Sequence, residues 1–278
     1  MTDIKGSKSG YAEIEGVRLF YEIAGQGSDL VLVHAGCADR RMWDGQFIAF
    51  AQHYRVLRYD MRGYGKSTVT RGPFSNRQDL YRLLEVLDIP KAYFVACSIG
   101  SQTVLDFALE HPENIASLTM VSPAVSGYEY KGPPPQPVMD LIAARQSGNL
   151  EQAAELQAQI WADGFKRNSD QVNAQVHELV RQMSLDALNL QADIIRETAF
   201  LLEEPLSPPA MQRLEHVTIP TLTIAGDLDD NTVLAIADLL ATRISGAQKT
   251  IIHGTAHMAN MEKPDKFNQI VLEFLERI

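Results

Sequence analysis

Residues 95–101 read Val-Ala-Cys-Ser-Ile-Gly-Ser, and this stretch lies between an apolar segment, Tyr93–Ala96, and a segment with helical periodicity. A nucleophile on a sharp turn from a strand to a helix requires small neighbours, because the two backbones nearly touch there. Ser98 meets this requirement with Ala96 two positions before it and Gly100 and Ser101 after it. The positive end of the following helix points at the same place and favours a developing oxyanion. The stretch therefore predicts a nucleophilic serine at a parallel strand's carboxyl end.

Cys97 is the rival nucleophile, because a thiolate attacks more readily than an alcohol. If Cys97 were the centre of the turn, the positions that must be small would be Val95 and Ile99. Both are β-branched and too bulky for close contact between the strand and the helix. This favours Ser98. A serine that merely caps a helix is the structural alternative.

A serine hydroxyl needs a histidine base that is oriented by a carboxylate, and in this architecture the acid precedes the histidine in the chain. The apolar stretch Leu222–Ala225 is followed by Gly-Asp-Leu-Asp-Asp at 226–230, and Asp229 is the predicted acid. His257 follows the last apolar stretch and is the predicted base. Parallel strands end at one edge of their sheet, so these side chains are expected near Ser98.

Other polar side chains in the same two loops receive structural interpretations. Asp227 and Asp230 are expected to be solvated or to cap the next helix. His253, directly at the end of a strand, is expected to be a structural histidine with a satisfied hydrogen bond.

Backbone amides that hold an oxyanion are expected after the stretch Leu30–Val33, where His-Ala-Gly-Cys-Ala follows at 34–38. We predict the N–H groups of Gly36 and Ile99 as the oxyanion hole, with Cys37 as the alternative on the first loop. His34 is expected to be a buried structural hydrogen-bonding group.

Outward from these motifs, the chain reads as an α/β protein. Glu15-Gly16 separates two alternating stretches, which predicts an antiparallel N-terminal hairpin. Short apolar runs then alternate with amphipathic segments, which predicts a mostly parallel, doubly wound sheet of about eight strands. The predicted buried strands are Leu30–Val33, Val56–Tyr59, Tyr93–Ala96, Leu118–Val121, Leu222–Ala225 and Thr250–Ile252.

The alternation stops between residues 126 and 218, where helices are predicted over Asn149–Trp161 and Val172–Met183 and no strand pattern occurs. We predict a core from residues 1–125 and 219–278 and a helical lid from 126–218, since pockets of such sheets lie where this insertion emerges. An insertion that only adds core is the alternative. Candidate pocket side chains are Cys37, Tyr128, Trp161, Phe165, Phe200 and Met258.

The segment at 60–67, Asp-Met-Arg-Gly-Tyr-Gly-Lys-Ser, follows another predicted strand. It lacks the spacing of a phosphate-binding loop. We interpret it as a turn held by an Asp60–Arg62 interaction and assign it no chemistry.

Composition excludes several partners. The 278-residue chain carries a formal net charge of −10, which argues against nucleic acid and anionic membranes. No apolar run is long enough to span a membrane, and the polar N-terminus does not read as a signal peptide. Two cysteines without metal-ligand spacing favour a reducing, cytoplasmic setting.

Taken together, these motifs resemble the α/β-hydrolase superfamily, over nearly the whole chain, and within it the small lidded branch of enol-lactonases, carboxylesterases, C–C bond hydrolases and cofactor-free perhydrolases. Ala96 and Ala35 stand where glycine is usual and Cys97 where histidine is common, so tuned activity is expected. Relatives that dehalogenate or open epoxides have an aspartate at the position of Ser98, which makes both activities unexpected here.

The resemblance implies a serine hydrolase that cleaves an ester or lactone of a small molecule through an acyl-enzyme, with no metal or organic cofactor. A C–C hydrolase, an enol-lactonase, a perhydrolase and a ligand-binding or signalling protein that keeps this fold remain alternatives. The sequence leaves open whether the protein is a monomer or a homodimer.

Overall fold

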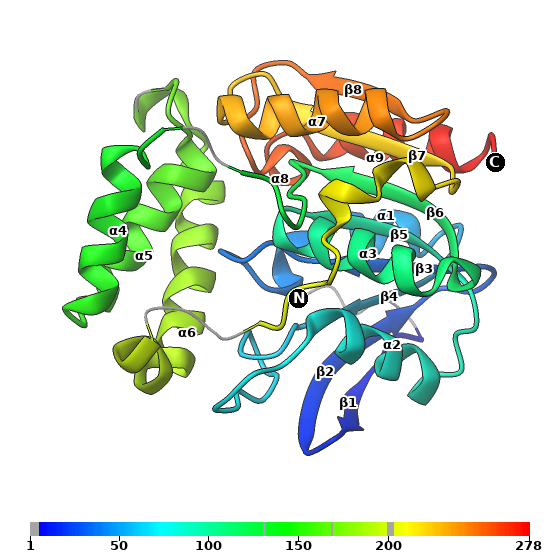
Figure 1. The fold of residues 1–278 in the computed structure, drawn as a ribbon, viewed down its shortest axis with the longest axis horizontal. Helices are drawn as coiled ribbons and strands as arrows, with labels where there is room; N and C mark the ends of the chain where they lie inside the picture. Colours follow the sequence, from blue (N-terminus) through cyan, green and yellow to red (C-terminus); the bar gives the residue numbers. More distant parts are fainter. Residues whose placement is uncertain (1–5, 130–131, 168, 199–202) are drawn as a thin grey trace.

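The computed structural model describes residues 6–129, 132–167, 169–198 and 203–278. Within this part, eight strands form one sheet in the order β1-β2-β4-β3-β5-β6-β7-β8 (Figure 1). The N-terminal pair β1–β2 is antiparallel, β2 also runs antiparallel to β4, and the remaining neighbours are parallel. This confirms the predicted sheet and its hairpin. The strands are β1 (Lys8–Ile14), β2 (Val17–Ala24), β3 (Asp29–Val33), β4 (Arg55–Tyr59), β5 (Ala92–Cys97), β6 (Ile115–Val121), β7 (Thr221–Gly226) and β8 (Gln248–Ile252).

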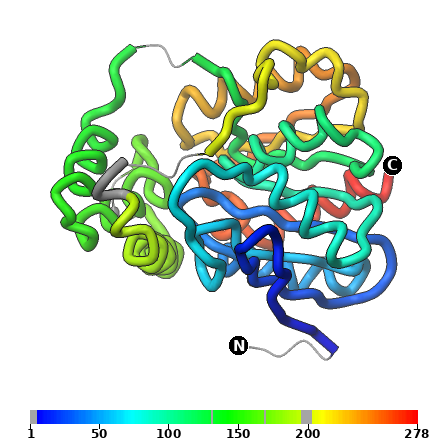
Figure 2. Tube along the Cα trace, turned by 60° about the horizontal axis from the view of Figure 1, so that its bottom comes forward, coloured from blue at the N-terminus to red at the C-terminus, as the bar shows by residue number. Residues whose placement is uncertain are grey.

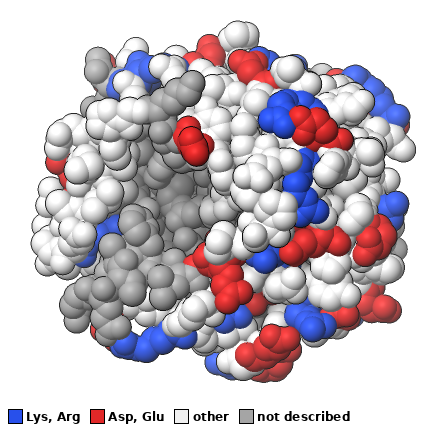
Figure 3. Space-filling model, in the orientation of Figure 1, with Lys and Arg blue, Asp and Glu red and all other residues white. Residues whose placement is uncertain are grey.

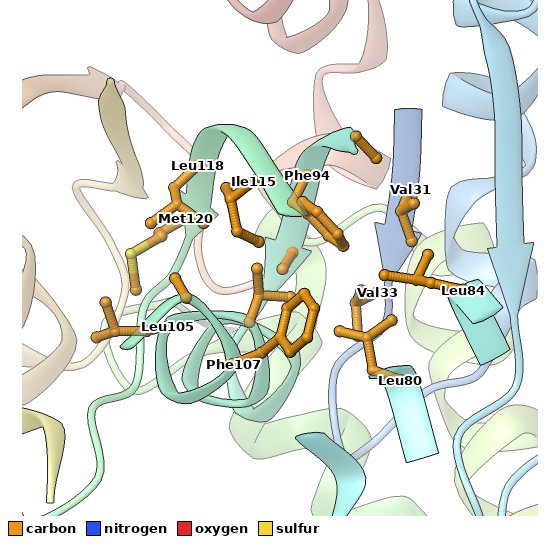
Figure 4. Close-up of a cluster of buried hydrophobic side chains, with 14 of the residues drawn as sticks. Val31, Val33, Leu80, Leu84, Phe94, Leu105, Phe107, Ile115, Leu118 and Met120 are labelled. Carbon is orange, nitrogen blue, oxygen red and sulfur yellow. The ribbon is translucent and has the colours of Figure 1, made fainter. Parts of the chain in front are cut away.

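Helices cover both faces of the sheet, so the central strands are apolar on both sides. On β3, Val31 and Val33 pack into one core cluster, and the alternating Leu30 and Leu32 pack into a second cluster on the opposite face. Figure 4 shows the first cluster, where Phe94 of β5 meets side chains from two helices. Helices α2 (Asn76–Val86), α3 (Ile99–Glu110) and α7 (Asn231–Arg243) supply this cluster, and α1 (Asp44–Phe50) and α9 (Pro264–Leu275) supply the other.

The last strand, β8, differs from the expectation of burial on both faces. Gln248 and Lys249 are exposed, and only Ile252 is fully buried. The reason is its position at the edge of the sheet, where it pairs with β7 alone. An apolar run of three residues cannot distinguish an edge strand from a central one.

Between β6 and β7 the chain forms a separate group of helices, which lies beside the α/β layers in both Figure 1 and Figure 2. It contains α4 (Gln136–Gln146), α5 (Leu150–Ala158), a π-helical turn η3 (Gln159–Asp163) and α6 (Ala174–Thr198). The helix expected to end at Met183 therefore continues to Thr198. These helices enclose a small cluster of their own, formed by Leu141, Ala144, Ala153, Ala154, Ile160 and Leu188.

The two ends of this insertion lie side by side on α3. Ala210 N donates to Ser126 Oγ at 2.9 Å, and Met211 N donates to Ser126 O at 3.0 Å. Ser126 Oγ in turn donates to Asp106 Oδ1 of α3 at 2.6 Å. One buried serine thus ties the entrance and the exit of the insertion to the helix that follows Ser98.

Burial raises the pKa of the Asp106 carboxyl to about 6, although the hydrogen bond from Ser126 opposes the shift. The folded state therefore binds this proton more tightly than the unfolded chain does. Between pH 4 and pH 6 this group lowers the free energy of unfolding as the pH rises, by up to about 3 kcal/mol. We expect Asp106→Asn, which keeps an oxygen acceptor, to remove that slope and to stabilise the protein at pH 7. Urea unfolding of both proteins at pH 4, 5, 6 and 7 measures the difference, and an unchanged slope would contradict it.

The turn after β4 is not held by an Asp60–Arg62 interaction, and that interpretation is wrong. The buried Asp60 pairs with Arg40 at 2.9 Å and accepts from Lys66 N at 2.9 Å. Arg62 instead makes two hydrogen bonds to Asp79 of α2, at 2.6 and 2.8 Å. The charged partners Arg40 and Asp79 lie 20 and 17 positions away in the chain, so neighbouring residues did not reveal them.

Acidic and basic side chains are mixed on one face of the molecule. On the face shown in Figure 3, acidic and basic side chains are interspersed over the α/β layers. Among the helices that the structure describes, none combines the length and the apolar composition needed to cross a membrane.

Candidate active site

Ser98 occupies a strained turn between β5 and α3. Its backbone has φ 55° and ψ −119°, a conformation that costs energy for a residue with a side chain. The structure also explains why the residues next to Ser98 must be small. A Cβ at Gly100 would lie 2.5 Å from the carbonyl oxygen of His34 and 2.7 Å from that of Val33. The turn therefore depends on a glycine two residues after Ser98.

The two rival nucleophiles lie in different environments. Ser98 is half-buried and lines a pocket, whereas Cys97 is fully buried in the second core cluster. Burial raises the pKa of the Cys97 thiol well above its ordinary value, which disfavours the reactive thiolate. The geometry thus favours Ser98, in agreement with the sequence argument.

The loops after β7 and β8 bring Asp229 and His257 together. His257 Nδ1 lies 3.1 and 3.0 Å from the two carboxylate oxygens of Asp229, and both residues are buried. Asp230 N donates to Asp229 Oδ1 at 2.7 Å, and Ser122 Oγ donates to the carbonyl oxygen of His257 at 3.0 Å. The imidazole is therefore held both through its ring and through its backbone.

The competing acid and histidine form a pair of their own. Asp227 Oδ2 lies 3.0 Å from Nδ1 of His253, whose side chain is 84% exposed. Asp230 caps α7 by accepting from Thr232 N at 2.7 Å. His253, Asp227 and Asp230 thus have the structural roles that the sequence suggested, although His253 is more exposed than a typical structural histidine.

Ser98 and His257 lie on either side of the end of β6. Ser98 N donates to the carbonyl oxygen of Val121 at 2.9 Å, and the next residue, Ser122, binds the His257 backbone. Trp161 lies next to both the Ser98 pocket and the His257 ring. It lines the same pocket as Ser98, and its ring centroid is 4.7 Å from that of His257.

The loop after β3 reaches the same pocket. Gly36 and Ile99, the two predicted amide donors, both line it together with Cys37. A Cβ at Gly36 would lie 3.2 Å from Cγ2 of Ile99, so the two segments approach closely. The loop is held from the helical insertion by Ser184 Oγ of α6, which donates to the carbonyl oxygen of Cys37 at 2.8 Å.

His34 stabilises the loop after β3 through hydrogen bonds of its ring. It is fully buried, its Nδ1 lies 2.8 Å from the carbonyl oxygen of Ala35, and its Nε2 accepts from Met61 N at 2.9 Å. One nitrogen donates and the other accepts, as in a neutral imidazole. Burial lowers the pKa of His34, which agrees with that tautomer and with the structural role expected from the sequence.

The pocket has a volume of about 280 Å³ and is bounded by both the sheet edge and the helical insertion. Its walls also hold three polar side chains that sequence reasoning missed: Tyr64, Arg145 and Gln157. Tyr64 belongs to the turn to which no chemistry was assigned, and Arg145 and Gln157 carry no local signal in their helices. Among the described residues, the lining consists of Gly36, Cys37, Tyr64, Ser98, Ile99, Val138, Leu141, Ile142, Arg145, Gln157 and Trp161.

Of the six predicted pocket side chains, Cys37 and Trp161 are in this lining. Tyr128 packs against the first core cluster, Met258 is buried in the second, and Phe165 is exposed. Phe200 lies outside the described residues. Among the residues whose positions are described, no group of three His, Cys, Asp or Glu side chains could hold a metal ion.

A sheet of this order, with a strained serine after β5 and a buried histidine–carboxylate pair after β7 and β8, defines an α/β hydrolase. The comparison with family models agrees, since the alpha/beta hydrolase fold model matches residues 30–264. The chain therefore belongs to the alpha/beta hydrolase fold family, and it is an enzyme of the hydrolase class.

Named relatives cover almost the whole chain. The chain is 29% identical to 3-oxoadipate enol-lactonase 2 of Acinetobacter baylyi, over 94% of each chain. It is 25% identical to 2-hydroxy-6-oxo-6-phenylhexa-2,4-dienoate hydrolase of Comamonas testosteroni, over 100% of both. The crystal structure of the enol-lactonase from Burkholderia xenovorans superimposes with a TM-score of 0.75 at 25% identity, covering 96% of this chain and 100% of that one.

Proposed function

We propose that the protein hydrolyses an ester or lactone bond of a small organic acid, with Ser98 as nucleophile, His257 as base and Asp229 as the carboxylate that orients it. The observation that carries this proposal is the strained backbone of Ser98 in the wall of the pocket. Such strain persists only where the surroundings impose it, and at a strand-to-helix turn it presents the hydroxyl to a substrate.

In the proposed reaction, the Ser98 hydroxyl proton moves to His257 Nε2 while Oγ forms a bond to the substrate carbonyl carbon. The carbonyl oxygen becomes an oxyanion, which the N–H groups of Gly36 and Ile99 stabilise. Collapse breaks the bond to the leaving oxygen, and that oxygen takes the proton from His257. A water molecule then gives a proton to His257 and attacks the acyl carbon, and Ser98 recovers its proton as the acid departs.

We assign the helical segment 126–218 as a lid, with 1–125 and 219–278 as the core. Two observations support this assignment. Val138, Leu141 and Arg145 of α4 line the same pocket as Ser98. Both ends of the segment are tied to α3 through Ser126, so its helices extend from one attachment point.

Arg145 supports a carboxylate-bearing substrate. Arg145 is half-buried and lines the same pocket as Ser98. Burial lowers the pKa of Arg145, yet a guanidinium keeps its charge throughout the pH range of enzymes. A cation in a largely apolar wall binds a carboxylate more strongly than it would in water. The names of two relatives, an enol-lactonase of 3-oxoadipate and a dienoate hydrolase, agree with an acidic substrate.

We expect the wild type to prefer mono-p-nitrophenyl glutarate to p-nitrophenyl valerate, which has the same chain length without the carboxylate. In Arg145→Met, kcat/KM for the glutarate should fall about 10- to 100-fold, because a charge-assisted hydrogen bond contributes about 1.5–3 kcal/mol. The valerate should change little. Arg181→Met, which alters an arginine of the same insertion that pairs with Glu178 and is not in the described lining, is the matched control.

The outcomes separate two claims. An equal loss for both esters, or none for either, would remove the carboxylate preference and leave the hydrolase proposal in place. A wild type that cleaves neither ester, nor an enol-lactone, would overturn the proposed function, and turnover of a dienoate alone would assign C–C cleavage instead.

A further inference from the structure

We infer that the buried ion pair Arg167–Glu262 is a positioning device that holds His257 in place from the helical insertion. The inference rests on the proposed function, since it assigns His257 the role of base. Neither residue lines the pocket, and each acts through the residues it binds.

Glu262 fixes the backbone next to the histidine. It ends the short helix α8 (Ala259–Glu262), and its Oε1 accepts from the N–H of Ala256 at 2.8 Å. Ala256 directly precedes His257 and is fully buried. Together with Ser122 Oγ, which donates to the carbonyl oxygen of His257, Glu262 holds the backbone by side-chain hydrogen bonds one residue before the histidine and at the histidine itself.

Arg167 connects this loop to the π-helical turn. Its Nε donates to the carbonyl oxygen of Asp163 at 2.8 Å, and its Nη2 donates to that of Ala162 at 2.7 Å. Its Nη1 pairs with Glu262 Oε2, and both side chains are only 6% exposed. One guanidinium fork therefore binds two carbonyl groups and a carboxylate, a combination that the point charge of a lysine cannot reproduce.

The π-helical turn also contacts the histidine ring. Trp161 lies within this turn, and its ring packs on His257 with centroids 4.7 Å apart. π-Helical turns within α-helices are rare and often mark functional sites. The turn is further fixed from α6, because His177 Nδ1 lies 2.8 Å from Asp163 Oδ1.

Close packing completes the contact. Gly164 has φ 78°, and a Cβ there would lie 2.9 Å from the Cβ of Ala256 and 3.2 Å from the carbonyl oxygen of Leu228, the residue before Asp229. The turn therefore touches the acid loop and the base loop at once. A small displacement of the π-helical turn must therefore either move the loop that carries His257 or open a gap between the turn and that loop.

The energetics of buried ion pairs favour a geometric role. Desolvation of two charges cancels much of their attraction, so such a pair contributes little net stability compared with apolar residues of the same volume. What the pair supplies here is a fixed distance between the turn that carries Trp161 and the backbone of His257. Arg167 and Glu262 are thus positioning residues.

The test compares Arg167→Met, Arg167→Lys and Glu262→Gln with the wild type. Glu110→Gln, which breaks the distant Arg77–Glu110 pair, is the matched control. For an activated p-nitrophenyl ester we expect kcat to fall about 10- to 100-fold in the three variants, because misplacement of a catalytic group by about 1 Å has effects of this size. KM should change much less than kcat, since neither substituted residue is in the described lining of the pocket. The rate of phosphonylation by diisopropyl fluorophosphate should fall in parallel.

Thermal unfolding midpoints, measured in parallel, separate positioning from stability. Arg167→Lys restores a positive charge beside Glu262, so its midpoint should return toward that of the wild type while its kcat stays low. A kcat that recovers together with the midpoint would overturn the positioning role. If Arg167→Met does not fold, the nearly isosteric Glu262→Gln carries the same comparison.

Two further outcomes are distinguishable. Wild-type kcat and phosphonylation rates in folded Arg167→Lys and Glu262→Gln would overturn this inference and leave the proposed function intact. A wild type that neither cleaves the ester nor reacts with the fluorophosphate would overturn the proposed function, and the inference with it.

Discussion

Ser98→Ala is expected to lower kcat for ester hydrolysis by about a million-fold, the loss seen when the serine of the subtilisin triad is removed. The reason is that Ser98 is the proposed nucleophile, and the Cys37 thiol, which also lines the described pocket, is a poor substitute because burial raises its pKa. The half-buried hydroxyl contributes little packing, so the variant should fold normally. Steady-state hydrolysis of a p-nitrophenyl ester and covalent labelling by a fluorophosphonate measure the loss.

Cys97→Ala is the control for this prediction. It removes the neighbouring thiol, which is fully buried and whose pKa is raised by burial, so most of the activity should remain. Appreciable turnover by Ser98→Ala, combined with inactivity of Cys97→Ala, would transfer the nucleophilic role to the cysteine.

Asp229→Asn is expected to lower kcat by about ten-thousand-fold with little change in KM, as in the corresponding change of a serine-protease triad. The Asp229 carboxylate lies within 3.1 Å of His257 Nδ1. In the proposed mechanism it holds the imidazole in the tautomer that leaves Nε2 free to accept a proton. An amide of the same shape can present an N–H to Nδ1 and select the wrong tautomer.

Asp227→Asn provides a matched control, since it makes the same change two residues earlier in the same loop. Asp227 pairs with the exposed His253 and with Gly254 N, so its removal should leave kcat within about threefold, as expected for an exposed ion pair. The reverse result, a loss in Asp227→Asn and normal activity in Asp229→Asn, would identify the wrong acid.

The residues proposed for catalysis are not the residues that stabilise the fold. Ser98, Asp229 and His257 lie on loops at the ends of β5, β7 and β8, while the two core clusters fill the faces of the sheet behind them. We therefore expect substitutions at these three positions to change rates far more than unfolding free energies.

Much of the fold could be predicted from local pattern. The hairpin β1–β2 follows from the alternation of its apolar residues, because one face is buried, and the strands β3 to β7 follow from their short continuous apolar runs, because both faces are buried. The candidate nucleophile could be predicted for the same reason. The requirement for small residues around Ser98 arises within a few positions, so the sequence records it directly.

Other features depend on partners far apart in the chain, and only the tertiary structure decided them. Asp60 pairs with Arg40 and not with Arg62, Arg145 lines the same pocket as Ser98, and Arg167 pairs with Glu262 across 95 positions. The local sequence around a charged residue does not indicate whether its side chain is exposed to solvent or forms an ion pair. Its partner is selected by how the helical insertion packs on the sheet, and no local pattern encodes that packing.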